Sequence, residues 1–382
     1  MLGVDHFISR YRHLQKVPTA LLTNHSTYSA SGYPCAYELL REGYNIRKLF
    51  SPEHGIYSRL EDGKSQPNEI DPLTKIPAIS LYGPRLAPQT EDLDGIDLVL
   101  IDLPNIGCRF YTYWWSITYM AEVCATAKKT VILLDRPNLS NRDCAEGPIL
   151  DETHCSSFLG RWRMPISHPY TYGQLLKWFV HERLIPLSLE VVPFDHEPDP
   201  QPASFVPVSP SMESLLSTWL YPCTGLFEGV NLSVGRGTAF PFRTLGAPWI
   251  NSLSCCEDFS KQDFLGVRAF PISFQPMWSQ YSGEFCNGLY FSVTNPATFK
   301  PVQTGLWLLN YFSQQYSEFL KESAYPTAAN PRGSQHLDKL VGIPNSFGSI
   351  CTGSELSMQE IQKLTDASSW RNKVETFLQR QS

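Results

Sequence analysis

The first half of the chain alternates short apolar runs with helix-like segments, and this alternation limits the folds it can adopt. Runs typical of buried strands occur at Thr19–Leu22, Ile46–Phe50, Ala78–Leu81, Leu98–Ile101 and Val131–Leu134. Helical periodicity occurs at Tyr37–Glu42, Trp114–Ala127 and Tyr172–Glu182. Strands that alternate with helices form parallel sheets covered by helices on both faces. The pattern therefore predicts an α/β domain built on a parallel sheet.

Polar residues directly follow four of the five runs. They are Asn24, Glu53 with His54, Asp102, and Asp135 with Arg136. Because parallel strands end at the same edge of a sheet, we expect these side chains to line one cleft. Glu53 could donate a proton, accept one or act as a nucleophile, with His54 tuning it or contacting substrate. The alternative is that Glu53 caps the next turn and His54 fills a polar niche.

A proline-rich passage, residues 193–210, interrupts both periodicities and indicates a domain boundary or crossover. Beyond it the patterns predict a strand at Gly288–Val293, a helix at Thr304–Lys321, and polar helices near Glu355–Leu364 and Ser369–Arg380. This half is typical of an α+β domain.

Composition excludes several classes of protein. Lys and Arg total 31 against 37 Asp and Glu, so no basic footprint for nucleic acid is present. No stretch is long enough to span a membrane and no signal peptide is evident, which predicts a soluble cytoplasmic protein. The ten cysteines lack metal-ligand spacing, and no glycine-rich phosphate loop follows a strand. We therefore expect neither a metal nor a nucleotide cofactor.

Two segments contain residues suited to saccharide chemistry. Residues 107–115 place Arg109 beside five aromatic rings, which suit a sugar carrying an anionic group, although an ordinary aromatic core fits equally well. Residues 225–238 combine closely spaced glycines with Glu228, Ser233, Arg236 and Thr238 in a loop that could approach a ligand or simply form a tight turn. The sequence around Ser233 narrowly misses a hydrolase nucleophile elbow, which leaves an acyl hydrolase as an alternative.

Short motifs occur along the chain in an order that resembles a known protein family. The motifs are Leu22–Asn24, Phe50–Gly55, Leu81–Gly83, Gly95–Asp97, Arg109–Tyr113, Leu134–Asn138, Glu146–Pro148, Phe227–Gly229, Gly235–Thr238 and Gly246–Trp249. Together they resemble the exo-β-N-acetylmuramidase family, glycoside hydrolase family 171, formerly a domain of unknown function. The resemblance implies a Rossmann-like catalytic domain (residues 1–195), a smaller α+β domain (196–382) that completes the cleft, and release of terminal N-acetylmuramic acid from peptidoglycan fragments. It implies no cofactor.

The resemblance also implies site residues. Glu53 is the expected catalytic acid/base and Tyr111 its partner. The expected substrate-binding residues are Asn24, His54, Asp102, Arg109, Asp135, Arg136, Glu146, His168, Glu228, Ser233, Arg236 and Thr238. The second catalytic group is open among Asp102, Asp135, Glu146, Glu228 and the acetamido group of the substrate. We expect Arg236, or else Arg109, to pair with the 3-O-lactyl carboxylate.

Two departures from the family pattern leave a second function open. Asn105 and Val234 stand where the family usually has carboxylates. These losses suggest an alternative to an active glycosidase. The chain could be a catalytically weakened relative that binds peptidoglycan fragments, or a regulatory protein.

Overall fold

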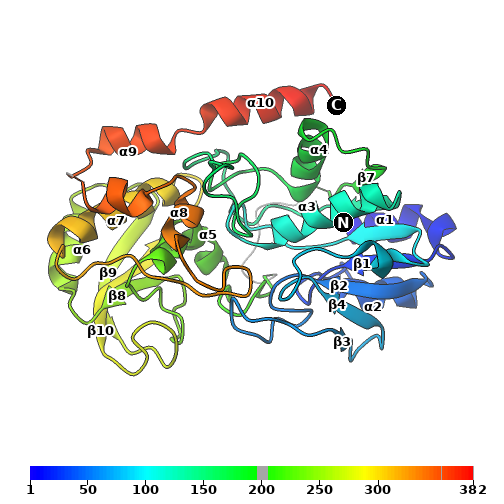
Figure 1. Ribbon diagram of the computed structural model, residues 1–382, viewed down its shortest axis with the longest axis horizontal. Coiled ribbons are helices and arrows are strands. Elements are labelled where there is room, and N and C mark those ends of the chain that lie inside the picture. The colour runs from blue at the N-terminus through cyan, green and yellow to red at the C-terminus, as the bar shows by residue number, and fades with distance from the viewer. Residues whose placement is uncertain (196–204, 354, 382) are drawn as a thin grey trace.

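The computed structural model describes residues 1–195, 205–353 and 355–381. Its N-terminal half forms a seven-stranded sheet with the order β3-β4-β2-β1-β5-β6-β7 (Figure 1). The strands are β1 (Thr19–Leu22), β2 (Ile46–Ser51), β3 (Glu69–Ile70), β4 (Pro77–Ser80), β5 (Leu98–Ile101), β6 (Thr130–Leu134) and β7 (Leu189–Val192). All neighbours are parallel except β3 and β4. The predicted parallel sheet is confirmed; the sequence did not indicate the edge strands β3 and β7.

Both faces of this sheet are buried, as the near-continuous apolar strands predict. In β5, Leu100 packs in a core with α1 (Gly3–Arg10) and α2 (Cys35–Arg41). Its neighbour Val99 packs in the core that contains α3 (Tyr113–Thr126) and α4 (Tyr172–Glu182). Successive side chains of a strand point to opposite faces, so one strand serves both cores. Short 3₁₀ helices occur at η1 (Arg12–Leu14) and η2 (Thr90–Leu93).

The second half is a smaller α+β unit around an antiparallel sheet with the order β8-β10-β9. Its strands are β8 (Thr244–Ala247), β9 (Val267–Phe274) and β10 (Cys286–Val293). Its helical elements are α5 (Leu215–Thr224), η4 (Gly225–Gly229), α6 (Ser252–Ser260), α7 (Pro301–Gln315), α8 (His336–Val341), the π-helical η5 (Phe347–Cys351), α9 (Met358–Thr365) and α10 (Ser368–Gln379). Helix α9 packs on α7, whereas α10 returns to α4 of the first unit (Figure 1).

The predicted helix over Thr304–Lys321 is wrong at its C-terminal end, because α7 stops at Gln315. The backbone amide of Lys321 is bound by the side chain of Asn231 at 2.7 Å. The next residue, Glu322, forms a β-bridge with Val230. These contacts draw the chain away from the helix axis, an effect that helical periodicity cannot predict.

The two units share one continuous hydrophobic core. The core on the α3 face of the first sheet includes Val99 and extends to Leu245 in β8 and Leu306 in α7. This continuity fixes the loops of one unit against those of the other. The predicted boundary between residues 195 and 196 adjoins residues 196–204 and lies outside the described residues. Within the described residues, no helix is both long and apolar enough to cross a membrane.

Candidate active site

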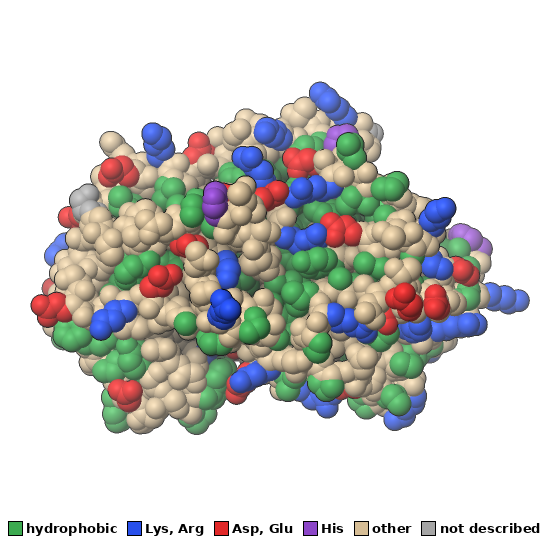
Figure 2. Space-filling view, viewed as in Figure 1, with side chains coloured by type: hydrophobic (Ala, Val, Ile, Leu, Met, Phe, Trp, Pro, Cys, Tyr) green, Lys and Arg blue, Asp and Glu red, His purple; other side chains and the backbone are tan. Residues whose placement is uncertain are grey.

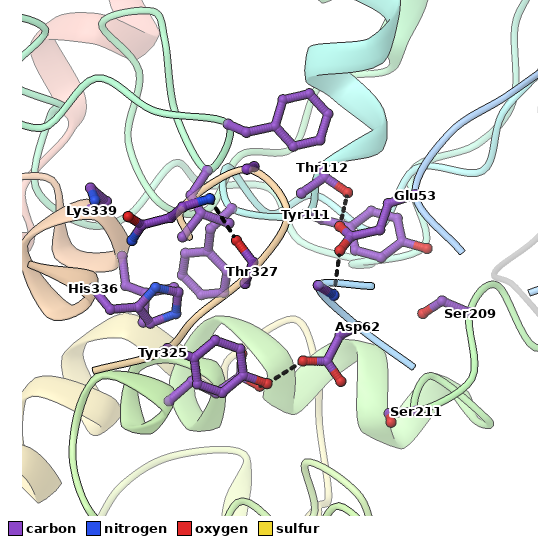
Figure 3. A pocket seen from close by; sticks show the side chains of 18 of the residues that line it. Glu53, Asp62, Tyr111, Thr112, Ser209, Ser211, Tyr325, Thr327, His336 and Lys339 are labelled. Carbon is purple, nitrogen blue, oxygen red and sulfur yellow. Dashed lines mark hydrogen bonds between the residues drawn. The ribbon is translucent and has the colours of Figure 1, made fainter. Parts of the chain in front are cut away.

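A cleft lies between the two units at the carboxyl edge of the parallel sheet. The first unit contributes the loop after β2 and the residues before α3. The second unit contributes η4, the segment before β8, and the chain from Tyr325 to α8. Figure 3 shows side chains from both units pointing into this space.

Glu53 lies on the first wall with both carboxylate oxygens held by donors. Its Oε1 accepts a hydrogen bond from the Gly63 amide at 2.9 Å, and its Oε2 accepts one from the Thr112 hydroxyl at 2.7 Å (Figure 3). Tyr82 lines the same wall. Burial and the negative charge of Glu53 raise the pKa of Tyr82, which keeps the phenol protonated as a donor. Glu53 is therefore a fixed carboxylate beside open space.

A sharp turn places Glu53 at this position. His54 and Gly55 both adopt left-handed conformations, with φ of 70° and 77°. Positive φ is uncommon for a residue with a side chain, although histidine adopts it more readily than most, and such conformations recur at functional sites. The His54 ring is held by a 3.0 Å contact between Nδ1 and the Leu60 carbonyl. The turn explains why Glu53 faces the cleft instead of capping a helix.

Two further carboxylates of the cleft share one arginine. Arg236 contacts Asp62 from Nη1 and Glu228 from Nε, both at 2.8 Å. The Tyr325 hydroxyl donates to Asp62 and lies 3.2 Å from Glu228. Burial raises the pKa of Glu228. Burial acts the same way on Asp62, but Arg236 and the Tyr325 hydroxyl outweigh it and hold the Asp62 pKa below its usual value.

Aromatic rings form much of the remaining surface of the cleft. Tyr111 is 5% exposed, and its hydroxyl donates to the Val208 carbonyl at 3.4 Å. Burial, together with the neighbouring Tyr113, raises the pKa of Tyr111, so its phenol stays protonated. Phe158 and Phe242 also line the space. Such rings suit the C–H faces of a pyranose.

Helix α8 contributes two basic side chains to the far end of the cleft. His336 is 3% exposed and stacks on Tyr325 with ring centroids 4.7 Å apart. Burial, reinforced by the charge of Lys339, lowers the pKa of His336 to about 4, so its ring is neutral near pH 7. The Lys339 ammonium donates to the Ser334 carbonyl at 2.8 Å.

Comparison with known proteins decides the family. The N-terminal model of the exo-β-N-acetylmuramidase NamZ family matches residues 19–216, and the C-terminal model matches residues 219–381. The chain belongs to the NamZ family. It is 32% identical over 372 residues to the peptidoglycan β-N-acetylmuramidase NamZ of Bacillus subtilis (strain 168), covering 94% of this chain and 89% of that protein. This homology supports a glycosidase of the muramidase type.

Two solved structures share the fold of this NamZ-family chain. Both are DUF1343 family proteins from Bacteroides fragilis NCTC 9343. One aligns with a TM-score of 0.83 at 21% identity, over 98% of this chain and 97% of that one. The other aligns with a TM-score of 0.71 at 24% identity, over 99% and 96%.

The structure brings five of the sequence-predicted residues together at the cleft. They are Glu53, His54, Tyr111, Glu228 and Arg236. The expectation that Arg236 offers its charge to a substrate is corrected, because two carboxylates already neutralise it. The other nine predicted residues lie outside the cleft.

Asp102 and Arg136 form a buried structural ion pair. Arg136 Nη2 contacts Asp102 at 2.8 Å and the Tyr28 carbonyl at 3.0 Å, while Asp102 is fully buried. The expectation that Asp102 lines the cleft with Glu53 is therefore corrected. The pair joins the ends of β5 and β6 with the loop that follows β1.

Asn24 and Asp135 are also directed away from the cleft. Asn24 donates to the Tyr113 hydroxyl at 3.1 Å and to the Val208 carbonyl at 3.0 Å, so it supports the aromatic wall from behind. Asp135 accepts from the Thr171 hydroxyl at 2.6 Å and the Gly173 amide at 3.0 Å. Burial raises the pKa of Asp135 to about 6. Both side chains follow their strands as predicted, but hydrogen bonds to other parts of the protein hold them away from the cleft.

Arg109, Glu146 and His168 are buried within the protein. Arg109 donates to the carbonyls of Pro148, Met164 and Leu340, at 3.0, 3.1 and 2.6 Å. Glu146 accepts from two amides at the N-terminus of α7, the nearer at 2.7 Å. His168 is 1% exposed, and burial lowers its pKa to about 3.

Ser233 and Thr238 shape the glycine-rich loop around Arg236. The Ser233 hydroxyl accepts from the Gly235 amide at 3.3 Å, and Ser233 is almost fully buried. The Thr238 hydroxyl donates to the Gly235 carbonyl at 2.6 Å. Ser233 does not line the cleft, so its placement does not favour a nucleophilic serine.

Sequence reasoning missed Asp62, Tyr325, His336 and Lys339. Asp62 had a weak signal, since Asp62-Gly63 is a turn dipeptide shortly after Glu53. The others lie in the segment 325–339, where no motif marks them.

Among the described residues, no group of three or more His, Cys, Asp or Glu could hold a metal ion. Figure 2 shows acidic and basic side chains interspersed over one face of the molecule.

Proposed function

We propose that this protein is an exo-β-N-acetylmuramidase that releases terminal N-acetylmuramic acid from peptidoglycan fragments, with Glu53 as the proton donor. The observation that carries the proposal is the placement of Glu53, held by Gly63 and Thr112 on the wall of a cleft that also contains the carboxylates of Asp62 and Glu228. Membership of the NamZ family supports it, as does the named activity of the Bacillus subtilis relative.

Glu53 would protonate the glycosidic oxygen as the bond to the anomeric carbon breaks. The leaving sugar then departs as a neutral alcohol while positive charge develops on the muramic acid ring. The hydrogen bonds from Gly63 and Thr112 keep the carboxyl group in one orientation through this step. The ring of Tyr111, on the same unit, would pack against the C–H face of the sugar.

The second catalytic role has two candidates with different chemistry. Of the two carboxylates that contact Arg236, Asp62 is the one held in its ionised form and so able to accept a proton, because its pKa is lowered whereas that of Glu228 is raised. It would activate the water that attacks the anomeric carbon. Alternatively, the 2-acetamido group of the substrate attacks its own anomeric carbon, and Asp62 then orients that group. Strong inhibition by a thiazoline analogue of the cyclised sugar would favour the second route.

The two family carboxylates that this chain lacks are not at the cleft. Asn105 accepts from the Gly107 amide at 2.9 Å and donates to the Tyr170 carbonyl at 3.0 Å. Val234 is 5% exposed and packs in the hydrophobic core. Neither residue lines the cleft, so these departures give little support to a weakened enzyme.

Release of a chromophore from a β-N-acetylmuramyl glycoside tests the proposal. Wild-type protein should turn it over, and Glu53→Gln should lower kcat by about 10²–10⁴-fold, the usual contribution of a general acid. Glu61→Gln, at an exposed glutamate in the same loop, is the matched control and should retain activity. Near wild-type turnover by Glu53→Gln would refute the role of Glu53. Binding of muramyl saccharides without any turnover by the wild type would instead identify a binding or regulatory protein.

A further inference from the structure

We propose that α8 forms the recognition site for the 3-O-lactyl carboxylate of the terminal muramic acid, with Lys339 as its cation and His336 as its neutral hydrogen-bonding partner. This inference rests on the proposed function, because it names the group that selects the substrate within the same cleft. It replaces the two arginines that the sequence suggested.

Arg236 cannot act as the free cation of the cleft. Its Nη1 and Nε groups contact Asp62 and Glu228, and Nη1 also donates to the Ser211 hydroxyl at 2.9 Å. The three charged groups together carry a net negative charge. A second carboxylate placed beside them would meet repulsion, so this end of the cleft disfavours the lactyl group.

Arg109 is excluded as the residue that binds the lactyl carboxylate, because it is buried and its guanidinium already has partners. The side chain is fully buried, and the carbonyls of Pro148, Met164 and Leu340 accept from its guanidinium. It does not line the cleft. Its role is to tie the chain near α8 to the first unit.

Apart from Arg236, Lys339 is the only lysine or arginine among the described residues that line the cleft. Among the described residues it forms no ion pair, and its ammonium donates only to the Ser334 carbonyl. The neighbouring Asp338 is engaged elsewhere, accepting from the Asn345 and Ser346 amides at 3.0 and 2.7 Å. An ammonium has three donors. Two of them therefore stay available to an anion.

His336 supplies an independent sign that a polar ligand group belongs here. Its Nδ1 is buried and has no hydrogen-bond partner among the described residues. An unsatisfied buried polar atom is costly, by about 1–3 kcal/mol in general, and a ligand with a matching donor or acceptor would remove that cost. Stacking on Tyr325 fixes the ring, and Tyr325 in turn contacts Asp62.

Lys339 and Glu53 lie in different parts of the cleft. In Figure 3, Lys339 and His336 lie on one side and Glu53 on the other, with Thr327 between them. In muramic acid the anomeric carbon and the lactyl carboxylate are at different ends of the molecule. With the anomeric carbon at Glu53, the carboxylate would therefore extend toward α8.

The kinetic test compares chromogenic N-acetylmuramyl and N-acetylglucosaminyl β-glycosides. Lys339→Met should lower the ratio of the two kcat/KM values by about 10- to 100-fold, the range of a charge-assisted hydrogen bond. Lys339→Arg should restore most of the ratio. The matched control is Lys373→Met, an exposed lysine of α10 outside this cleft, which should leave the ratio unchanged.

A binding test separates this inference from the proposed function. Calorimetry with the Glu53→Gln protein measures N-acetylmuramic acid against its lactyl methyl ester, which lacks the charge. The acid should bind at least about 10-fold more tightly, and Lys339→Met should abolish the difference. Equal binding of acid and ester, or a preference that survives Lys339→Met, would overturn the inference while leaving hydrolysis intact. Absence of muramyl hydrolysis by the wild type would instead overturn the proposed function.

Discussion

The hydroxyl of Thr112 donates a 2.7 Å hydrogen bond to Oε2 of Glu53, joining the start of α3 to the loop after β2. Thr112 precedes the first residue of α3, where a threonine hydroxyl commonly caps its own helix. Here the hydroxyl makes no such cap. Helix α3 therefore lacks the stabilisation of a side-chain cap, and the hydroxyl instead fixes the orientation of Glu53.

Removing this hydroxyl should therefore impair hydrolysis more than folding. Thr112→Val keeps the shape of the side chain but leaves Oε2 without its donor, and kcat/KM should fall by about 10- to 100-fold, as for loss of a hydrogen bond to a charged group. Thr112→Ser retains the hydroxyl and should stay within a few-fold of wild type. Equal activity of the valine and serine variants would show that the contact does not matter for turnover.

The cluster of Arg236 with Asp62 and Glu228 should contribute mainly to stability. Arg236→Met leaves the buried Glu228 and the partly exposed Asp62 without their counter-charge, so the free energy of unfolding should fall by up to about 3–5 kcal/mol. The double variant Arg236→Met/Glu228→Gln removes one of the stranded charges and should recover part of that loss. Urea unfolding of the four proteins gives the coupling energy, and strict additivity would contradict the pairing.

Asp135 should make the protein less stable as pH rises through 6. Burial raises its pKa to about 6 from 3.8, so between these values the folded protein binds more protons than the unfolded chain. The free energy of unfolding then falls with increasing pH in that window. The Asp135→Asn variant lacks this titration. The free energy of unfolding of Asp135→Asn minus that of the wild type should therefore rise by up to about 3 kcal/mol between pH 4 and 7. This value follows from about 1.4 kcal/mol for each unit by which the pKa is raised.

Parallel urea titrations at several pH values, with Asp135→Asn beside the wild type, check this dependence. Both proteins share every other titrating group, so their difference isolates Asp135. A difference that does not change between pH 4 and 7 would contradict the raised pKa.

Gly333 should be essential for the segment that carries Tyr325. Its φ is 63°, and a Cβ there would lie 2.5 Å from backbone atoms of Tyr325 and Pro326. Gly333→Ala should displace Tyr325 and lower kcat/KM by about 10-fold or more, since small misplacements are costly in catalysis. Gly32→Ala is the control, because Gly32 has φ of 81° but no described atom within 4 Å of the added Cβ.

That control should lose only about 1–2 kcal/mol of stability, the usual cost of a left-handed side chain. Its kcat/KM should match the wild type. If both alanine variants hydrolyse substrate equally well, the close backbone approach at Gly333 does not position Tyr325.

The sequence predicted the core of the first unit because local patterns carry that information. The five apolar runs became parallel strands, and the segment Tyr172–Glu182 became a helix with the predicted bounds. The short edge strand β3 and the early end of α7 were missed. Both depend on pairing with distant segments, namely Glu69 with Ala78 and Lys321 with Asn231.

The candidate site was only partly predictable for a similar reason. The position of Glu53 after β2 followed from strand topology, and its motif supported the resemblance to a glycosidase family. Asp102 and Asp135 follow their strands in the same way, yet Arg136 and Thr171 capture them. Position along a strand determines the edge of the sheet, but the nearest donors determine where a carboxylate points.

By itself the sequence determined the strand and helix order, the α/β class and the position of Glu53, because these depend on periodicity and on residues close in the chain. Only the tertiary structure decided which charges are free. Arg236 is neutralised by Asp62, far from it in sequence. Lys339 forms no ion pair with any residue that the structure describes, and its neighbour Asp338 binds the amides of Asn345 and Ser346. Electrostatic pairing depends on distance in space, and only the folded chain sets that distance.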